Sequence, residues 1–321
     1  MKAVWFLSCL LAGTPFTDGI NDNKPVPQYK IVYLYPEGQG VDKGIEENGI
    51  KITSGPGADN GKRGPERTEA SGKTYDVGDK ARMEIYFPEK SNGLLIITCP
   101  GGSYAYVSAV NEGYCAAEWL LKQGCIVCNM FYRPPCGRKE IPLRDVQNAL
   151  RYCRHYAAEW GVDKIGVMGS SAGGHLAASA AVMYEDGLTR PDFSILLYPV
   201  IMMEGEYAHG NSRKNLLGEN ASRKDMERYS LQKRVSPDTP VTFIALSADD
   251  NRVSMHNSME YFSALRENGV KSQMHIYPIG GHGWGFARPP YRKNDKLGDY
   301  REVFEAALSR FIKDQVSDTK K

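Results

Sequence analysis

The stretch "VMGSSAGGHLAAS", Val167–Ser179, places small residues between an apolar run and an alanine-rich run. The run "KIGVM" predicts a strand, and the alanine-rich run predicts a helix from about Ala172 to Tyr184. The turn between them, "GSSAG", fits G-x-S-x-G, in which the middle serine lies on a sharp, strained strand-to-helix turn. Larger side chains at its two glycines would collide with the strand and the helix. The pattern therefore predicts that Ser171 is held at the carboxyl end of a strand as a nucleophile rather than lying in a plain tight turn.

The rest of the chain alternates between strand and helix patterns, which predicts one α/β domain. Strand-helix-strand units need crossover connections, so we expect a mainly parallel, twisted sheet with helices on both faces. Residues 36–78 are polar and glycine-rich, and residues 203–240 predict an irregular, cap-like insertion. The predicted strands lie at residues 81–89, 93–102, 125–133, 164–170, 193–201, 241–250 and 272–281, and the predicted helices at 112–124, 143–161, 172–184, 256–269 and 300–315.

Length and charge limit the possible partners. With 321 residues, 41% of them hydrophobic, the chain can bury a large core. Its formal net charge is only +2, and no basic stripe or tail is present, so we expect no nucleic-acid partner. No segment is long and apolar enough to span a membrane.

The N-terminus has the order of a secretory signal peptide, with a basic start at Lys2, an apolar run from Ala3 to Leu11, and then small residues. We predict a signal peptide at residues 1–20 and a single domain at residues 21–321, so that the protein is secreted or periplasmic. A buried first strand is the competing interpretation. Attachment to the cell surface by a lipid on Cys9 is a weaker alternative, because "FLS" before it fits a lipoprotein cleavage site poorly.

The cysteine pattern favours small buried thiols over a metal or redox site. Cys125 and Cys128 form a C-x-x-C pair, but the pair lies inside "GCIVCNMFYR", which predicts a buried strand, and no second pair follows at zinc spacing. We therefore predict no metal. The seven cysteines are Cys9, Cys99, Cys115, Cys125, Cys128, Cys136 and Cys153.

A serine nucleophile needs a base, and the base needs an acid that holds its tautomer. With this kind of turn the order along the chain is serine, acid, histidine, each on a loop after a strand. Among six histidines only His282, in "YPIGGHGWGF" after the last predicted strand, meets that order. The acid comes from "VTFIALSADDNRVS", where Asp249 and Asp250 both qualify. We favour Asp250, because the pattern D-x-x-V from Asp250 to Val253 is the usual start of the next helix in this kind of loop. Asp249 suits a turn or cap.

An oxyanion hole needs backbone N–H groups aimed at the reacting carbonyl. The amide of Ala172, directly after the nucleophile, is one candidate donor. The early strand-to-helix loop "CPGGSYAYVS" supplies the others, the amides of Gly102 and Ser103, where lipases and esterases carry an HGGG-type run.

These segments together resemble a known family. The stretches "PGGSYAYVSAVNEG", "YRPP", "IPLRDVQNALRYCRHYAAEWGVDKIGVMGSSAGGHLAAS", "PDFSILLYPVI", "NLLG", "ADDNRVSMHNS" and "GGHGWG" are similar to the α/β-hydrolase carbohydrate esterases of gut bacteria, which include acetylxylan and feruloyl esterases. The resemblance covers most of the chain from about Tyr29. It implies an α/β-hydrolase fold, often export, and hydrolysis of esters on plant cell-wall carbohydrate without a cofactor.

Carried over to this chain, the resemblance implies Ser171 as nucleophile, His282 as general base and acid, and Asp250 as the orienting acid. It also implies oxyanion donors within residues 100–104 and at Ala172. One departure is Ser103, which stands where the family usually has a third glycine; if φ is positive there, the serine is strained.

The acyl pocket is not defined by the sequence. Tyr104, Tyr106, Trp284 and Phe286 flank the predicted catalytic loops. Their rings either stack on a sugar or line an acyl pocket, or they pack in the core, and both interpretations stay open. Tyr104 and Trp284 are the two we name as candidate substrate contacts.

Removal of acetyl groups from xylan or xylo-oligosaccharides is the predicted activity, with feruloyl or broader carbohydrate esterase activity as the alternative. A serine peptidase is less favoured, because such enzymes on this fold usually carry a large extra domain. A non-catalytic binding protein would be expected to lack Ser171 or His282. A glycosidase needs two opposed carboxylates, and no such pair is marked.

Overall fold

The computed structural model describes residues 28–34, 45–47, 50–52, 66–77, 81–288 and 291–317. The predicted signal peptide, residues 1–20, and Cys9 lie outside these residues.

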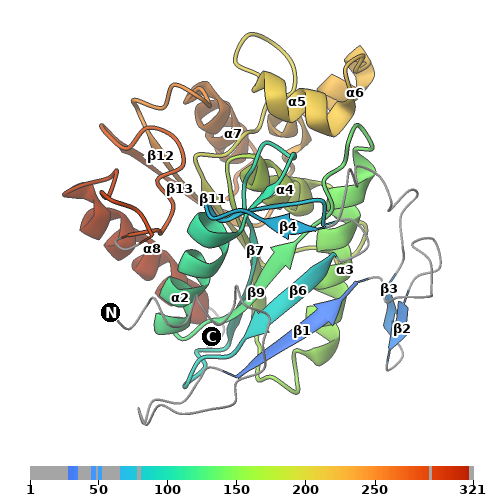
Figure 1. Cartoon of the computed structure of the whole chain (residues 1–321), viewed down its shortest axis with the longest axis vertical. Helices are drawn as coiled ribbons and strands as arrows, with labels where there is room; N and C mark the ends of the chain where they lie inside the picture. The colour runs from blue at the N-terminus through green and yellow to red at the C-terminus, as the bar shows by residue number, and fades with distance from the viewer. Residues whose placement is uncertain are drawn as a thin grey trace.

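An eight-stranded sheet forms the centre of the fold (Figure 1). Its strands are β1 (Tyr29–Tyr33), β6 (Arg82–Tyr86), β7 (Leu94–Cys99), β9 (Ile126–Phe131), β10 (Lys164–Ser170), β11 (Phe193–Leu197), β12 (Val241–Ser247) and β13 (Ser272–Tyr277). Their order across the sheet is β1-β6-β9-β7-β10-β11-β12-β13. The neighbours from β9 to β13 pair in parallel, and β6 runs antiparallel to both β1 and β9. The predicted mainly parallel sheet is confirmed.

The central strands are buried over their whole length. In β7, "LLIITC", and β9, "IVCNMF", every residue is buried, as expected for strands covered by helices on both faces. β10 lies between β7 and β11, so its carboxyl end, where Ser171 follows, is near the middle of the sheet.

Helices cover both faces of the sheet. They are α2 (Cys115–Lys122), continuous with the π-helix η2 (Ala109–Tyr114), α3 (Glu140–Tyr156), α4 (Ala172–Val182), α5 (Gly210–Leu217), α6 (Arg223–Arg228), the 3-10 helix η3 (Leu231–Arg234), α7 (His256–Glu267) and α8 (Tyr300–Ser317). Phe311 of α8 packs against Phe193 of β11 and Phe243 of β12. Figure 1 shows α2 and α8 on one side of the sheet and α3 and α4 on the other.

Two stretches contain short elements that the sequence does not predict. The glycine-rich segment contains β2 (Ile45–Glu47), β3 (Ile50–Ile52), β4 (Arg67–Thr68) and β5 (Lys73–Tyr75), and β5 pairs with β8 (Val107–Ser108) beside the loop after β7. The predicted irregular insertion at residues 203–240 contains α5, α6 and η3. For residues 203–240 the expectation of irregular structure was wrong, because the pattern gave no weight to short helices stabilised by caps.

The cysteines agree with the prediction of buried thiols at Cys99, Cys115, Cys125, Cys128 and Cys153, whereas Cys136 is exposed. All six are free thiols, and the C-x-x-C pair belongs to the buried β9 region. Among the described residues, no helix combines the length and apolar character needed to cross a membrane.

Candidate active site

Ser171 lies on a tight turn between β10 and α4. Its backbone has φ 54° and ψ −122°, a conformation that non-glycine residues rarely adopt. A Cβ added at Gly169 would lie 2.0 Å from the carbonyl oxygen of Gly173, and one added at Gly173 would lie 2.0 Å from that of Cys99. The predicted reason for the two glycines is therefore correct, since the strand, the turn and the helix approach too closely for side chains.

Ser171, His282 and Asp250 form one chain of hydrogen bonds. Ser171 Oγ is 2.8 Å from His282 Nε2, and His282 Nδ1 is 2.7 Å from Asp250 Oδ2. The Asp250 side chain is 2% exposed and the His282 side chain 20%. The three residues follow β10, β12 and β13, so the parallel sheet brings their loops to the same edge.

The two neighbouring aspartates make different contacts. Asp250 bonds to the His282 imidazole, whereas Asp249 Oδ1 accepts a hydrogen bond of 2.7 Å from the Gly281 amide. Burial by itself would raise the pKa of Asp250, but His282 and the amides of Val253 and Arg252 outweigh it and hold that pKa below its usual value. This geometry places Asp250 as the partner of the imidazole. Asp249 anchors the loop after β13 that carries His282, residues 278–287, which we call the histidine loop.

Positively charged side chains fix the carbonyl groups of the histidine loop. Lys296 Nζ donates to the His282 carbonyl at 2.6 Å. Arg292 donates to the Gly283 carbonyl at 2.9 Å and to the Trp284 carbonyl at 2.7 Å. Lys296 and Arg292 bind backbone carbonyls, and no sequence motif predicts such contacts. The sequence analysis therefore does not name these two residues.

The loop after β7 contains two backbone amides without an acceptor among the residues that the structure describes. Within the described part of the chain, the amides of Gly102, Ser103 and Ala172 donate to no protein acceptor. Gly102 has φ 133° and Ser103 has φ 53°, so the conformation that favours glycine occurs at the serine as well.

The peptide groups on either side of these amides are held by side chains. Tyr132 OH donates to the Pro100 carbonyl at 2.7 Å, and Asn215 Nδ2 of α5 donates to the Ser103 carbonyl at 2.8 Å. The cap-like insertion thus reaches the loop after β7. Asn215 is the first residue of "NLLG", but no local sequence pattern predicts its contact with the Ser103 carbonyl.

The structure corrects the candidate substrate contacts. Tyr104 is 1% exposed and its hydroxyl lies 2.8 Å from His175 Nδ1, while Trp284 is fully buried against Phe304. Both are core residues, since burial leaves them no surface for a sugar. Phe286 is also buried, whereas Tyr106 is partly exposed and packs against Tyr75.

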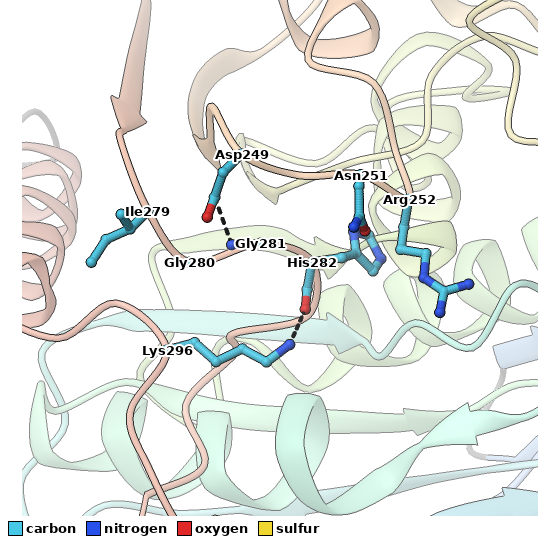
Figure 2. Close-up of a pocket in the computed structure, with 8 residues that line it drawn as sticks. All are labelled: Asp249, Asn251, Arg252, Ile279, Gly280, Gly281, His282 and Lys296. Atoms are coloured by element: carbon cyan, nitrogen blue, oxygen red, sulfur yellow. Dashed lines mark hydrogen bonds between the residues drawn. The ribbon is translucent and has the colours of Figure 1, made fainter.

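An open depression of about 480 Å³ lies beside His282. Figure 2 shows the residues that line it, with the Lys296 side chain directed at the His282 carbonyl. The residues that line it are Asp249, Asn251, Arg252, Ile279, Gly280, Gly281, His282 and Lys296. Ser171 is 6% exposed and does not line the depression, so its hydrogen bond to His282 is what connects the serine to it. Among the described residues, no three His, Cys, Asp or Glu side chains gather as a possible metal site.

The arrangement of strand, nucleophile turn, acid loop and histidine loop can be compared with known proteins. Residues 97–286 match the family described as the alpha/beta hydrolase fold. The chain belongs to the α/β hydrolase family. The matched region begins in β7 and ends in the histidine loop, so it contains every residue of the hydrogen-bonded chain.

Among α/β hydrolases, the predicted resemblance to acetylxylan esterases is confirmed. The chain is 39% identical over 223 residues to an acetylxylan esterase from Xylanibacter ruminicola, covering 66% of this chain and 46% of that protein. It is 32% identical over 227 residues to endo-1,4-beta-xylanase B from Butyrivibrio fibrisolvens, covering 66% of this chain and 35% of that protein. The chain thus spans less than half the length of both relatives.

A solved structure of a related hydrolase is similar to this fold. The acetyl ester-xyloside bifunctional hydrolase from Caldicellulosiruptor lactoaceticus is 30% identical and has a TM-score of 0.64. The similarity covers 72% of this chain and 88% of that one.

Proposed function

We propose that this protein is a serine carboxylic ester hydrolase that removes acetyl groups from xylan or xylo-oligosaccharides. The observation that carries the proposal is the relay from Ser171 through His282 to Asp250. The amides of Gly102, Ser103 and Ala172, which have no acceptor among the described residues, support it. The similarity to an acetylxylan esterase supports the choice of acyl group and carbohydrate.

In the proposed first step, His282 Nε2 takes the proton of Ser171 Oγ as the oxygen attacks the ester carbonyl. The carbonyl oxygen becomes an anion, which the amides of Gly102, Ser103 and Ala172 stabilise. Asp250 accepts the Nδ1–H of the imidazole and stabilises its charged form without taking the proton.

In the second half of the reaction, His282 gives the proton to the departing sugar hydroxyl and the acyl group stays on Ser171. Water, deprotonated by the same imidazole, then attacks the acyl-enzyme and releases acetate. Since His282 lines the open depression, we place the departing sugar there. Asn251, Arg252 and Lys296 give this surface the polar groups that sugar hydroxyls need.

We further infer that residues 21–321 contain one α/β-hydrolase domain, which is exported after removal of residues 1–20. The basic and apolar order of the N-terminus supports this, and so does the substrate, because a cell-wall polysaccharide lies outside the cell.

The test measures the products released from acetylated xylan and from feruloylated arabinoxylan, with Ser171→Ala as the blank. We expect acetate from the native protein and a loss of turnover on the order of 10⁶ in Ser171→Ala. Ser263→Ala, which changes an exposed serine of α7, is the matched control and should keep full activity.

Other products would redirect the assignment. Ferulate in comparable yield would indicate a broader esterase, and new reducing ends without acetate would indicate a glycosidase. Retained ester hydrolysis in folded Ser171→Ala would contradict the assignment of the nucleophile.

A further inference from the structure

A buried carboxylate connects the loop after β7 to the histidine loop. Glu112 lies in η2 and is 6% exposed. Its Oε2 accepts a hydrogen bond of 2.7 Å from the Gly101 amide, and its Oε1 accepts one of 2.8 Å from the Tyr198 hydroxyl. The proposed mechanism gives this carboxylate no proton to transfer.

On the first side, Glu112 holds the backbone directly before the oxyanion donors. The carbonyl of Pro100 accepts from Tyr132 OH, and the amide of Gly101 donates to Glu112, so both ends of one peptide group are bound. A Cβ added at Gly101 would lie 2.7 Å from Glu112 Oε2 and 3.0 Å from Ser171 Cβ. The carboxylate therefore sets the position of the loop at its closest approach to the nucleophile.

On the second side, Tyr198 carries the contact to the histidine loop. Its hydroxyl donates to Glu112 and accepts a hydrogen bond of 3.0 Å from the Gly285 amide. Its ring lies 5.1 Å from the His282 ring, in an edge-to-face arrangement. Tyr198 follows β11 and has φ 37°, which is an unfavourable conformation for a non-glycine residue. In this conformation its hydroxyl reaches Glu112 and its ring lies against His282.

Asn111, which precedes Glu112 in η2, also binds the histidine loop. Asn111 Nδ2 donates to the Gly283 carbonyl at 3.1 Å, and Asn111 Oδ1 accepts from the Ala287 amide at 3.0 Å. One turn of helix thus holds the histidine loop through Asn111 and the loop after β7 through Glu112.

We propose that Glu112 is a positioning residue that sets the oxyanion donors at the distance from His282 and Ser171 that the transition state requires. The proposal rests on the proposed ester hydrolysis. A carboxylate suits the place because both of its contacts are donors, the Gly101 amide and the Tyr198 hydroxyl, and its two oxygens only accept. A glutamine offers one acceptor and one donor there, so one of the two contacts is lost or reversed.

The experiment measures kcat and KM of Glu112→Gln on p-nitrophenyl acetate. We expect kcat to fall about 10- to 100-fold and KM to change less than about threefold, because the donors act on the transition state and not on the bound ester. The inhibition constant of a boronic acid, which forms a tetrahedral adduct on a serine oxygen, should rise by about the same factor as kcat falls. Tyr198→Phe, which keeps the ring, should show the same pattern with a smaller effect.

A second buried glutamate and tyrosine pair supplies the matched control. Glu84 of β6 is 5% exposed, and its Oε2 accepts a hydrogen bond of 2.8 Å from Tyr86 OH. Glu84 also pairs with Arg82 Nε at 3.0 Å and contacts neither the loop after β7 nor the loop that carries His282. Glu84→Gln should therefore lower stability at least as much as Glu112→Gln while leaving kcat and the boronic acid constant unchanged.

The outcomes separate this inference from the proposed function. If the native protein hydrolyses no ester and Ser171 is not labelled by a fluorophosphonate, the proposed function fails. If the native protein is active and folded Glu112→Gln keeps its kcat, or loses kcat without weakening the boronic acid, the positioning role is overturned.

Discussion

The nucleophile turn requires glycine, which has no side chain, at positions 169 and 173. Gly169 and Gly173 leave room for the carbonyl oxygens that pass within 2.0 Å of their missing Cβ positions. Ser103 is the contrary case, because its φ of 53° places a side chain where glycine is favoured. Such a residue stores on the order of 1 kcal/mol of strain, which its surroundings must offset. The Ser103 hydrogen bond to Asn215 is one contact that does so.

Beneath the nucleophile, His175 makes folding stability depend on pH. It is fully buried, with Nδ1 beside Tyr104 OH and Nε2 beside the Tyr229 carbonyl. Burial lowers the pKa of His175 from 6.5 to about 4, while the Tyr229 contact opposes the shift. Between these values the unfolded chain binds a proton that the folded chain does not, so stability falls as pH decreases from 6.5 to 4. The shift corresponds to a loss on the order of 3 kcal/mol.

Urea unfolding at about pH 7.5 and about pH 4.5 checks this prediction. The loss of unfolding free energy between the two should be smaller in His175→Gln than in the native protein by about 2 to 3 kcal/mol. His155→Gln, at an exposed position of α3, should leave the loss unchanged. Equal losses in all three proteins would contradict a neutral, buried His175.

At the scale of elements, side-chain caps stabilise the helices α5 and α6 in the insertion at residues 203–240, and α5 contacts the loop after β7. The His209 imidazole accepts from the Ser212 amide at the start of α5, and the Ser222 hydroxyl accepts from the Asp225 amide at the start of α6. The capped α5 then places Asn215 against the loop after β7. The insertion was predicted as irregular because a histidine cap and two short helices give a weak periodic signal.

Removing the Asn215 side chain should weaken the proposed oxyanion hole without harming the helix. We expect Asn215→Ala to lower kcat about tenfold, less than the loss of a donor, because the Ser103 amide stays but loses one restraint. Alanine is a good helix former, so stability should not suffer from helix propensity. Steady-state kinetics measure the effect, with exposed Asn211→Ala on the same helix as the control. A variant within about twofold of the native kcat would show that the contact is dispensable.

At the scale of the whole molecule, a buried ion pair ties the end of β9 to α3. Arg133 and Asp145 have fully buried side chains, and Arg133 Nη2 lies 2.6 Å from Asp145 Oδ1. Asp145 Oδ2 also accepts from the Arg133 amide at 2.9 Å. The pair fixes the segment "YRPP" at the carboxyl edge of the sheet, beside the loop that Tyr132 binds.

Asp145→Asn should reduce the free energy of unfolding by about 3 to 5 kcal/mol, because it leaves a buried guanidinium without its counter-charge. Asp314→Asn is the control, since Asp314 pairs with Arg310 on the surface and should contribute less than about 1 kcal/mol. Denaturant unfolding of both variants measures the difference. A loss below about 1 kcal/mol in Asp145→Asn would contradict the assigned importance of the pair.

The sequence by itself determined the alternation of strands and helices and the mainly parallel sheet, and it singled out Ser171 and His282 as candidate catalytic residues. These follow from short-range properties, namely periodicity, glycines in the "GSSAG" turn, and the order of residues along the chain. Each could be recognised within a window of a few residues or from the position of a loop after a strand.

The sequence favoured Asp250 over Asp249, but only the tertiary structure shows which of them contacts His282. Only the tertiary structure places Tyr104 and Trp284 in the core and brings Glu112, Tyr198 and Asn215 to the site. The sheet order decides these contacts, because it places β10 between β7 and β11 and so brings loops from distant parts of the chain to one edge. Tyr198 and Glu112 are far apart in sequence, and their hydrogen bond exists only once that edge has formed. Which polar group finds which partner is a property of the packed edge, and no local pattern encodes it.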